Sequence, residues 1–192
     1  GGGEPGEVLI LSEEGVRSEW PFRAEEKAFC MLEYVYFARP ESIMGGVNVA
    51  KVRTEMGREL ARKFPVAADI VVPVPDSGNY AALGFAHELN LPYEHAFVRN
   101  HYIGRTFLQP SQLIRDFDVR VKLNLIKEAV EGKRVVVVDD SIVRGTTARA
   151  RVVNLREAGA KDVHLRFSCP PTRLSCHYGT DFPDPKKTMT TT

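Results

Sequence analysis

The sequence has few cysteines, a single tryptophan and no long hydrophobic run. Three cysteines among 192 residues are an odd, small number, which does not fit a disulfide-bonded scaffold and favours a reducing cytoplasm. No apolar run approaches the roughly 20 residues of a membrane-spanning helix, and the opening GGGEPGEV lacks the character of a signal peptide. The net charge of +1 argues against nucleic acid as a partner. We therefore expect a cytoplasmic protein whose partners are neither a membrane nor a nucleic acid.

What the sequence does contain is an alternation of strand and helix patterns in a chain long enough for one sizeable core. Strands are predicted at 33–37, 69–74, 94–99, 135–138 and 163–167, and helices at 48–63, 79–89, 119–130 and 148–158. The alternation predicts an α/β fold with a doubly wound, mainly parallel sheet. The first helix carries an apolar stripe that we interpret as core, formed by Val49, Val52, Met56, Leu60 and Phe64.

Residues 134–147, RVVVVDDSIVRGTT, form the stretch around which the chain is organised. Four consecutive valines predict a strand buried on both faces, and Asp139 and Asp140 follow at its carboxyl end, where open α/β sheets bind ligands. The next loop offers hydroxyls, a glycine and the first N–H groups of a helix, which suit a phosphate. Two adjacent carboxylates repel phosphate and should instead face sugar hydroxyls or Mg²⁺. A plain solvated turn that caps a helix is the alternative.

Two further segments are candidates for the same edge. The turn VPVPDSG follows a predicted strand and precedes a helix, so that Asp76, Ser77 and Gly78 point toward the carboxyl edge, although PDSG alone is often a plain turn. Residues 100–118 form a long basic and partly apolar segment that contains Arg105. Loops of this length in compact domains are often lids over a substrate, and the alternative is a solvated loop.

The string VVVVDDSIVRGTT resembles the phosphoribosyl pyrophosphate (PRPP) motif of type I phosphoribosyltransferases. Its DDSIVRGTT form is similar to that of the glutamine PRPP amidotransferase family, whose members make phosphoribosylamine at the start of de novo purine synthesis. RNHYIGRTFLQPSQ resembles the flexible loop that closes over PRPP in that family. The resemblance spans about residues 4–183.

The resemblance implies a set of functional residues. The residues implied to be catalytic are Asp139, Asp140 and Arg105. The residues implied to bind Mg²⁺ are Ser77, Asp139 and Asp140. The residues implied to bind PRPP are Asp76, Ser77, Gly78, Ser141, Ile142, Val143, Arg144, Gly145, Thr146 and Thr147. The implied reaction is the displacement of pyrophosphate from PRPP by ammonia that a glutaminase domain releases from glutamine.

The resemblance also implies a domain organisation. Residues 1–21 are expected to be a linker or the end of an N-terminal glutaminase domain, 22–183 the phosphoribosyltransferase domain and 184–192 a disordered tail. No nucleophilic cysteine stands at the amino terminus, so we do not expect this chain to hydrolyse glutamine. A homo-oligomer, as a tetramer, and inhibition by purine nucleotides are further implications.

Cys30 and Cys176 match two of the four ligands of the [4Fe–4S] cluster that one branch of the family carries. The other two family ligands lie beyond residue 192, and two thiolates do not complete a four-cysteine site. We therefore expect no loaded cluster in this chain, and Cys169 is interpreted as structural. Three alternative functions remain open: a nucleobase phosphoribosyltransferase, a PRPP-binding regulator without catalysis, and a structural module without a competent site.

Overall fold

The computed structural model describes residues 3–26, 28–99, 123–142 and 145–170. The chain divides into two compact units, Gly1–Met31 and Leu32–Thr192. The smaller unit contains an antiparallel hairpin of β1 (Val8–Ser12) and β2 (Gly15–Glu19), in which Val8 pairs with Glu19 and Ser12 with Gly15. The larger unit contains every described residue that was predicted to bind PRPP or Mg²⁺.

The larger unit is built on a parallel three-stranded sheet in the order β5 (Ile70–Pro73), β8 (Arg134–Asp139), β9 (Asp162–Phe167). Because successive side chains of a strand point to opposite faces, Val136 and Val138 of β8 enter one core cluster and Val135 and Val137 the other. All four valines are buried, as expected of a central strand with both faces covered.

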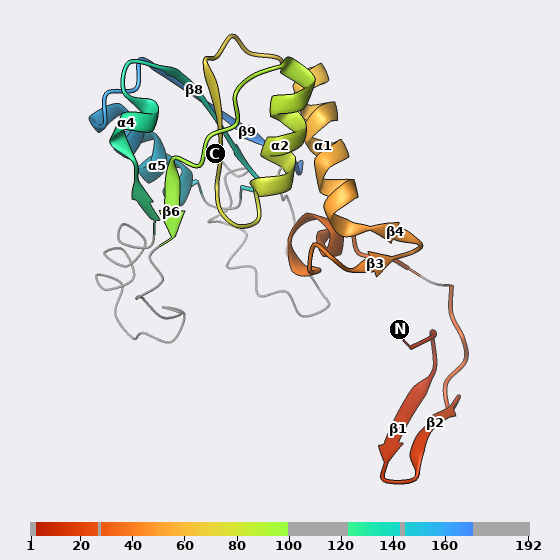
Figure 1. Ribbon diagram of the computed structural model, residues 1–192. Coiled ribbons are helices and arrows are strands. Elements are labelled where there is room, and N and C mark those ends of the chain that lie inside the picture. Colours follow the sequence, from red (N-terminus) through yellow and green to blue (C-terminus); the bar gives the residue numbers. More distant parts are fainter. Residues whose placement is uncertain (1–2, 27, 100–122, 143–144, 171–192) are drawn as a thin grey trace. The chain divides into compact units, whose positions relative to one another are not determined.

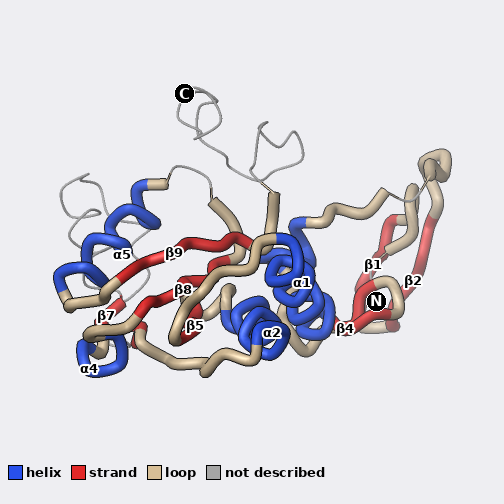
Figure 2. The backbone as a smooth tube through the Cα atoms, turned by 90° about the horizontal axis from the view of Figure 1, so that it is seen from above, coloured by secondary structure: helices blue, strands red, loops and turns tan. Residues whose placement is uncertain are grey.

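Helices cover both faces of this sheet, as Figures 1 and 2 show. The cluster on one face includes residues of α1 (Val49–Lys63) and α2 (Asn79–Leu89). The cluster on the other face includes Val130 of α4 (Lys127–Val130) and Leu155 of α5 (Thr146–Glu157). Helix α5 connects β8 to the parallel strand β9. The predicted α/β fold with a doubly wound, mainly parallel sheet is confirmed.

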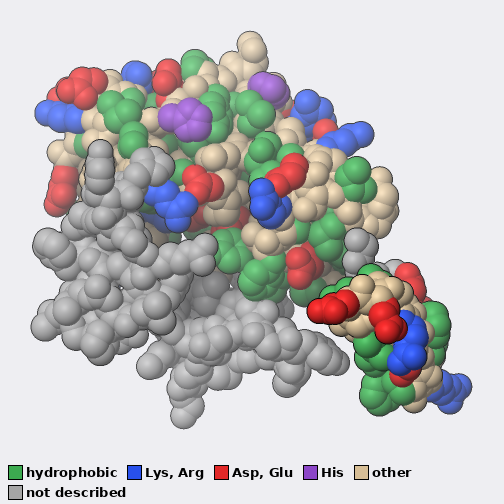
Figure 3. Space-filling view, turned by 60° about the horizontal axis from the view of Figure 1, so that its bottom comes forward, with side chains coloured by type: hydrophobic (Ala, Val, Ile, Leu, Met, Phe, Trp, Pro, Cys, Tyr) green, Lys and Arg blue, Asp and Glu red, His purple; other side chains and the backbone are tan. Residues whose placement is uncertain are grey.

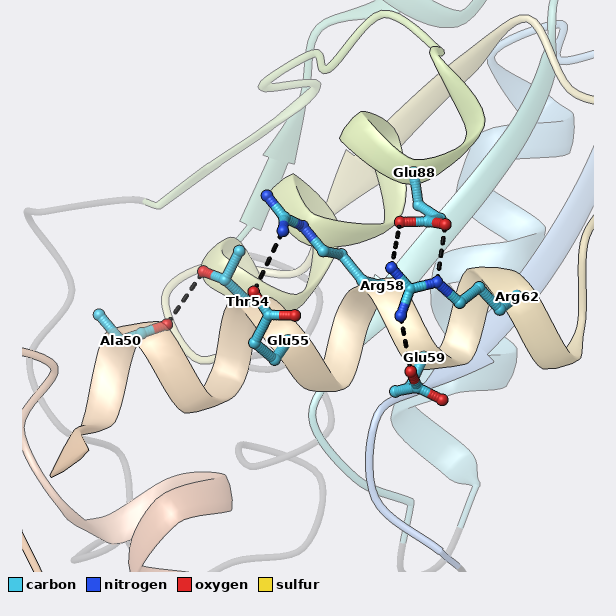
Figure 4. A network of polar contacts seen from close by, with 7 residues as sticks. All are labelled: Ala50, Thr54, Glu55, Arg58, Glu59, Arg62 and Glu88. Atoms are coloured by element: carbon cyan, nitrogen blue, oxygen red, sulfur yellow. Dashed lines mark hydrogen bonds and ion pairs between the residues drawn. The ribbon is translucent and has the colours of Figure 1, made fainter.

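Helices α1 and α2 pack closely because glycines lie at their contact. A Cβ atom on Gly57 would stand 1.9 Å from the carbonyl oxygen of Ala81, and one on Gly84 1.9 Å from that of Thr54. At the end of the contact, Arg62 of α1 donates two hydrogen bonds of 2.7 and 2.9 Å to the Glu88 carboxylate of α2 (Figure 4). The interface therefore combines close backbone contact with a bidentate Arg62–Glu88 ion pair at its exposed edge.

The prediction of a strand at 33–37 is wrong, because Glu33–Phe37 forms a single π-helical turn, η1. Ala38 N–H closes this turn by donating a hydrogen bond to the Glu33 carbonyl oxygen. Among the described residues, no strand pairs with this segment. Instead, the buried Arg53 of α1 donates to the carbonyl oxygens of Tyr34 at 2.6 Å and Ala38 at 2.9 Å. An arginine side chain thus satisfies carbonyls that a neighbouring strand would have bound.

A short hairpin of β3 (Ile43–Met44) and β4 (Val47–Asn48) leads into α1. The helix begins where predicted, since Asn48 caps it by accepting a hydrogen bond from Lys51 N–H. Helix α2 has the predicted bounds, and β5, β8, β9 and α5 lie within two residues of their predicted positions.

Two predictions around the long loop are wrong in part. The strand predicted at 94–99 is shorter, β6 (Phe97–Arg99), and it pairs with β7 (Leu123–Leu125) in a separate antiparallel ribbon. A helix was predicted at 119–130, but residues 123–125 form the strand β7, and only α4 is helical in the described part of this range. Residues 119–122 of that prediction lie outside the described residues. A local sequence pattern does not reveal a strand partner 28 positions away, which is the separation of the paired residues Phe97 and Leu125 on opposite sides of the loop.

The apolar stripe of α1 is core only in part. Val49 is buried, but Val52, Met56 and Leu60 are half-buried and Phe64 is 59% exposed. The face that packs on the rest of the unit consists of Val49, Arg53, Gly57 and Ala61. Small residues on this face permit the close approach of α2, which hydrophobicity alone does not reveal.

An ion pair joins the amino-terminal ends of the first two sheet strands. The Asp69 carboxylate accepts from Arg134 N–H at 2.7 Å and from the Arg134 guanidinium at 2.6 Å. Hydrogen bonds from the side chain and backbone of Arg134 lower the pKa of Asp69 from 3.8 to about 2.

Because this folded-state pKa is below the unfolded value, the pair stabilises the fold above about pH 4, and the effect is lost as pH falls toward 2. We predict that Asp69→Asn lowers the urea midpoint at pH 7, and that wild type and variant converge between pH 4 and 2. Glu128→Gln, an exposed acid, serves as the control. A gap between the midpoints that stays constant down to pH 2 would contradict this assignment.

No helix among the described residues is long and apolar enough to span a membrane. On the face of the larger unit shown in Figure 3, basic and acidic side chains are interspersed with hydrophobic ones.

Candidate functional site

The loops that follow β5 and β8 meet at one edge of the sheet. The strands are parallel neighbours, with Pro73 opposite Val138, so their carboxyl ends lie side by side. The absence of a side chain at Gly78 allows the backbone segments to approach closely. A Cβ atom there would come within 2.6 Å of the Val138 carbonyl oxygen and 2.8 Å of the Val74 carbonyl oxygen. The turn at 76–78 and the start of the loop at 139–142 therefore lie side by side at the carboxyl edge of the sheet, where open α/β sheets bind ligands.

Asp139 ends β8 with both carboxylate oxygens bound by the protein. Oδ1 accepts from Asp140 N–H at 2.9 Å, and Oδ2 accepts from an Arg151 guanidinium N–H of α5 at 2.6 Å. Burial raises the pKa of Asp139 to about 6, against the lowering effect of Arg151. Arg151 was not recognised in the sequence, since a residue 12 positions downstream carries no local signal for this contact.

Asp140 is 6% exposed, and its carboxylate is only partly satisfied. Oδ1 accepts from the Ser141 hydroxyl at 2.8 Å, whereas Oδ2 is buried without a hydrogen-bond partner among the described residues. Buried hydrogen-bond acceptors almost always have a partner, so this oxygen is a candidate for contact with a bound ligand. A carboxylate oxygen is the donor that Mg²⁺ prefers, and it also accepts from sugar hydroxyls. The Asp140 carboxylate therefore fits the predicted magnesium and ribose role, whereas both Asp139 oxygens already accept hydrogen bonds from the protein.

Arg53 is a second arginine that the sequence did not reveal. It lies buried on α1, and burial lowers its pKa while the negative charge of Asp140 acts in the opposite direction. The signal available was a charged residue four positions from both Val49 and Gly57, on the face of α1 that packs inward. Arg53 thus supplies positive charge on the Asp140 side of the strand, as Arg151 does for Asp139.

The loop after the carboxylates leads into the amino terminus of α5. Gly145 takes φ +75°, a left-handed conformation that glycine adopts without strain, and immediately precedes the helix. Thr146 and Thr147 are exposed in the first turn, and Ser141 and Ile142 are half-buried. Val143 and Arg144 lie outside the described residues. Free N–H groups at a helix start can bind a phosphate, in agreement with the predicted role of this loop.

The turn after β5 is differently organised. The Pro75–Asp76 peptide is cis, and Gly78 N–H donates to the Val74 carbonyl at 2.9 Å. The exposed Asp76 carboxylate forms an ion pair with Arg99 at the end of β6, and Ser77 is half-buried. Arg99 thereby links this turn to the entrance of the long loop. Arg105 and the rest of 100–122 lie outside the described residues.

An apolar groove of about 980 Å³ lies between α1 and the end of β9. Its lining includes Val52, Met56 and Leu60 of the α1 stripe, together with Phe167 and Ile142. Three basic residues, Lys51, Lys63 and Arg166, also border this mainly apolar groove.

The structure describes two of the three cysteines. Cys30 is exposed and belongs to the smaller unit, Cys169 is a free thiol in the larger unit, and Cys176 lies outside the described residues. Among the described residues no group of three or more His, Cys, Asp or Glu side chains could hold a metal ion. Three cysteines cannot supply the four thiolates of a [4Fe–4S] cluster, so the chain by itself does not fit that cofactor.

The parallel sheet, the paired acids and the helix start at its carboxyl edge define a domain of the type I phosphoribosyltransferase class. No protein-family model matches the chain. Curated relatives do. Over 182 residues, 95% of the chain, it is 52% identical to the amidophosphoribosyltransferase of Mycobacterium tuberculosis, of which it covers 34%. It is 50% identical to the Bacillus subtilis enzyme over 178 residues, which are 93% of the chain and 37% of that relative.

Two solved structures agree. Glutamine PRPP amidotransferase from Bacillus subtilis, in complex with ADP and GMP, matches 98% of the chain and 41% of its own with a TM-score of 0.82 and 47% identity. A structure of the allosteric regulatory enzyme of purine biosynthesis matches 93% of the chain and 38% of its own, with a TM-score of 0.79 and 50% identity. The chain is thus similar to amidophosphoribosyltransferases over 93–95% of its own length, and it spans about a third of the length of the curated relatives that it matches.

Proposed function

We propose that this chain is the PRPP-binding part of an amidophosphoribosyltransferase, in which ammonia displaces pyrophosphate from PRPP to give 5-phosphoribosylamine. The observation that carries the proposal is the buried Asp140 Oδ2, which has no hydrogen-bond partner among the described residues, in the loop that leads to the helix start at Gly145. A ligand with a phosphate at one end and hydroxyls or a chelated cation at the other satisfies both features.

Each part of the site has one task in this proposal. Residues 141–147 bind the 5-phosphate, Asp139 and Asp140 face the ribose hydroxyls, and 76–78 receive the pyrophosphate. Ser77, Asp139 and Asp140 would hold Mg²⁺, whose charge supports the departure of pyrophosphate. Arg105 would close the loop over the substrate. The transition state is oxocarbenium-like, so the chain contributes mainly by positioning, by charge and by excluding water.

The remaining assignments rest on the relatives. Ammonia would come from glutamine through an N-terminal glutaminase domain, with 1–21 as the linker to it, 22–183 as the transferase domain and 184–192 as a disordered tail. The Bacillus subtilis relative was solved with ADP and GMP, which supports purine nucleotides as inhibitors here. A cytoplasmic homo-oligomer is part of the same proposal. Cys30 and Cys176 would join a [4Fe–4S] cluster only if two further cysteines are supplied from outside this chain.

We predict that the chain binds PRPP in calorimetry with Mg²⁺, and that EDTA weakens binding by about tenfold or more, because charge-assisted contacts to the cation are lost. Ribose 5-phosphate, which lacks the pyrophosphate, should bind more weakly than PRPP. Failure to bind PRPP, or binding that is indifferent to Mg²⁺, would refute the proposal. Binding by the longer protein without ammonium-dependent product would favour a regulator, and product only with a purine base a nucleobase transferase.

A further inference from the structure

The two adjacent carboxylates of the site have unequal surroundings. Asp139 accepts from Asp140 N–H and from Arg151, so the protein binds both of its oxygens. Asp140 keeps Oδ2 buried and without a partner among the described residues. Neighbouring strand residues point to opposite faces of the sheet, which directs the two acids toward different elements. Of the two, Asp140 has the freer oxygen for a ligand.

Arg151 lies in the second turn of α5. The loop proposed to bind the 5-phosphate, residues 141–147 (here the phosphate loop), leads into the first turn of this helix. The Arg151 and Asp139 side chains are only 17% and 14% exposed, so water screens their 2.6 Å contact weakly. The buried Nε of Arg151 has no partner among the described residues, which leaves Asp139 as the group that orients the guanidinium. The contact joins the strand end that carries the acids to the helix that carries the loop.

We propose that Arg151 is a positioning residue: it holds the Asp139 carboxylate against α5, so that Asp140 presents the ligand-facing oxygen at a fixed distance from the phosphate loop. This proposal rests on the proposed function of the site. Arg151 acts through Asp139 and does not contact the substrate. Removing the guanidinium frees the Asp139 carboxylate to turn, and the acid pair then no longer matches one ligand.

The test is a double-mutant cycle on PRPP affinity, measured by calorimetry with saturating Mg²⁺ on Arg151→Met, Asp139→Asn and the double variant. Loss of one charge-assisted hydrogen bond predicts about tenfold weaker binding for Arg151→Met. In the Asp139→Asn background the same change should have less than about a twofold effect, because the group that it positions is already altered. Arg151→Lys, which keeps the charge, should recover most of the affinity. The control is Arg156→Gln, which removes an exposed charge from the last turn of α5 and should leave affinity unchanged.

Thermal unfolding of each variant accompanies the affinities, and Arg151→Gln, which keeps a neutral donor, replaces Arg151→Met if the latter does not fold. Effects of Arg151→Met and Asp139→Asn that multiply would overturn the proposal, since Arg151 would then act on the ligand independently. An unchanged affinity in Arg151→Met would overturn it as well. Wild-type protein that fails to bind PRPP would instead refute the proposed function, so the two failures are distinct.

Discussion

Asp139→Asn combined with Asp140→Asn should lower magnesium-dependent pyrophosphate release from PRPP, with ammonium salts as nitrogen source, by at least about a hundredfold in the full-length protein. The estimate counts the loss of two charge-assisted interactions with cation and ribose, at about 1.5–3 kcal/mol each. Asparagine keeps the volume of both side chains, so packing changes little. The measurement is initial rate against PRPP concentration at saturating Mg²⁺.

Of the two single variants, Asp140→Asn should have the larger effect, because its Oδ2 is the carboxylate oxygen that no group among the described residues binds. The matched control removes two exposed acids, Glu128→Gln with Glu157→Gln, on α4 and α5. Turnover that survives in the Asp139, Asp140 double variant would remove these carboxylates from the mechanism.

The largest expected effect on stability comes from a single methyl group at the contact of α1 and α2. Gly57→Ala places its Cβ atom 1.9 Å from the Ala81 carbonyl oxygen, and Gly84→Ala does the same against Thr54. Neither obstacle is a side chain that can turn away, so the helices must separate. Overpacking of this kind costs about 3 kcal/mol. We expect each variant to lower the urea midpoint of unfolding markedly.

At a solvent-exposed helix position, Gly→Ala stabilises the helix by up to about 1 kcal/mol. The sign of the change in stability therefore shows whether the two helices are in backbone contact. Lys51→Ala, at an exposed position of α1, should leave the midpoint nearly unchanged. The Gly57, Gly84 double variant should lose less than the two single losses together, because one separation relieves both contacts. A higher midpoint for either glycine variant would show that the helices are not in backbone contact.

The position of the site was predictable because a short stretch of sequence contains its parts. Four valines require cover on both faces, and acids directly after them stand at the carboxyl edge of the sheet. Helix α2 and strand β8 were predicted because their patterns are long or strongly apolar. The turn at η1 and the strand β7 were not, since what decides each is a distant group: the Arg53 side chain for η1, and β6 for β7.

The sequence by itself determined the class of fold and the position of the two acids at the carboxyl edge of the sheet, because these follow from patterns within a few residues. Only the tertiary structure decided how the acids differ. Asp139 is held by Arg151, and Asp140 lies on the Arg53 side with one oxygen that has no hydrogen-bond partner in the described part of the chain. The physical reason is that burial and hydrogen bonding depend on groups that folding brings from other elements, and residue order along the chain does not encode their distances.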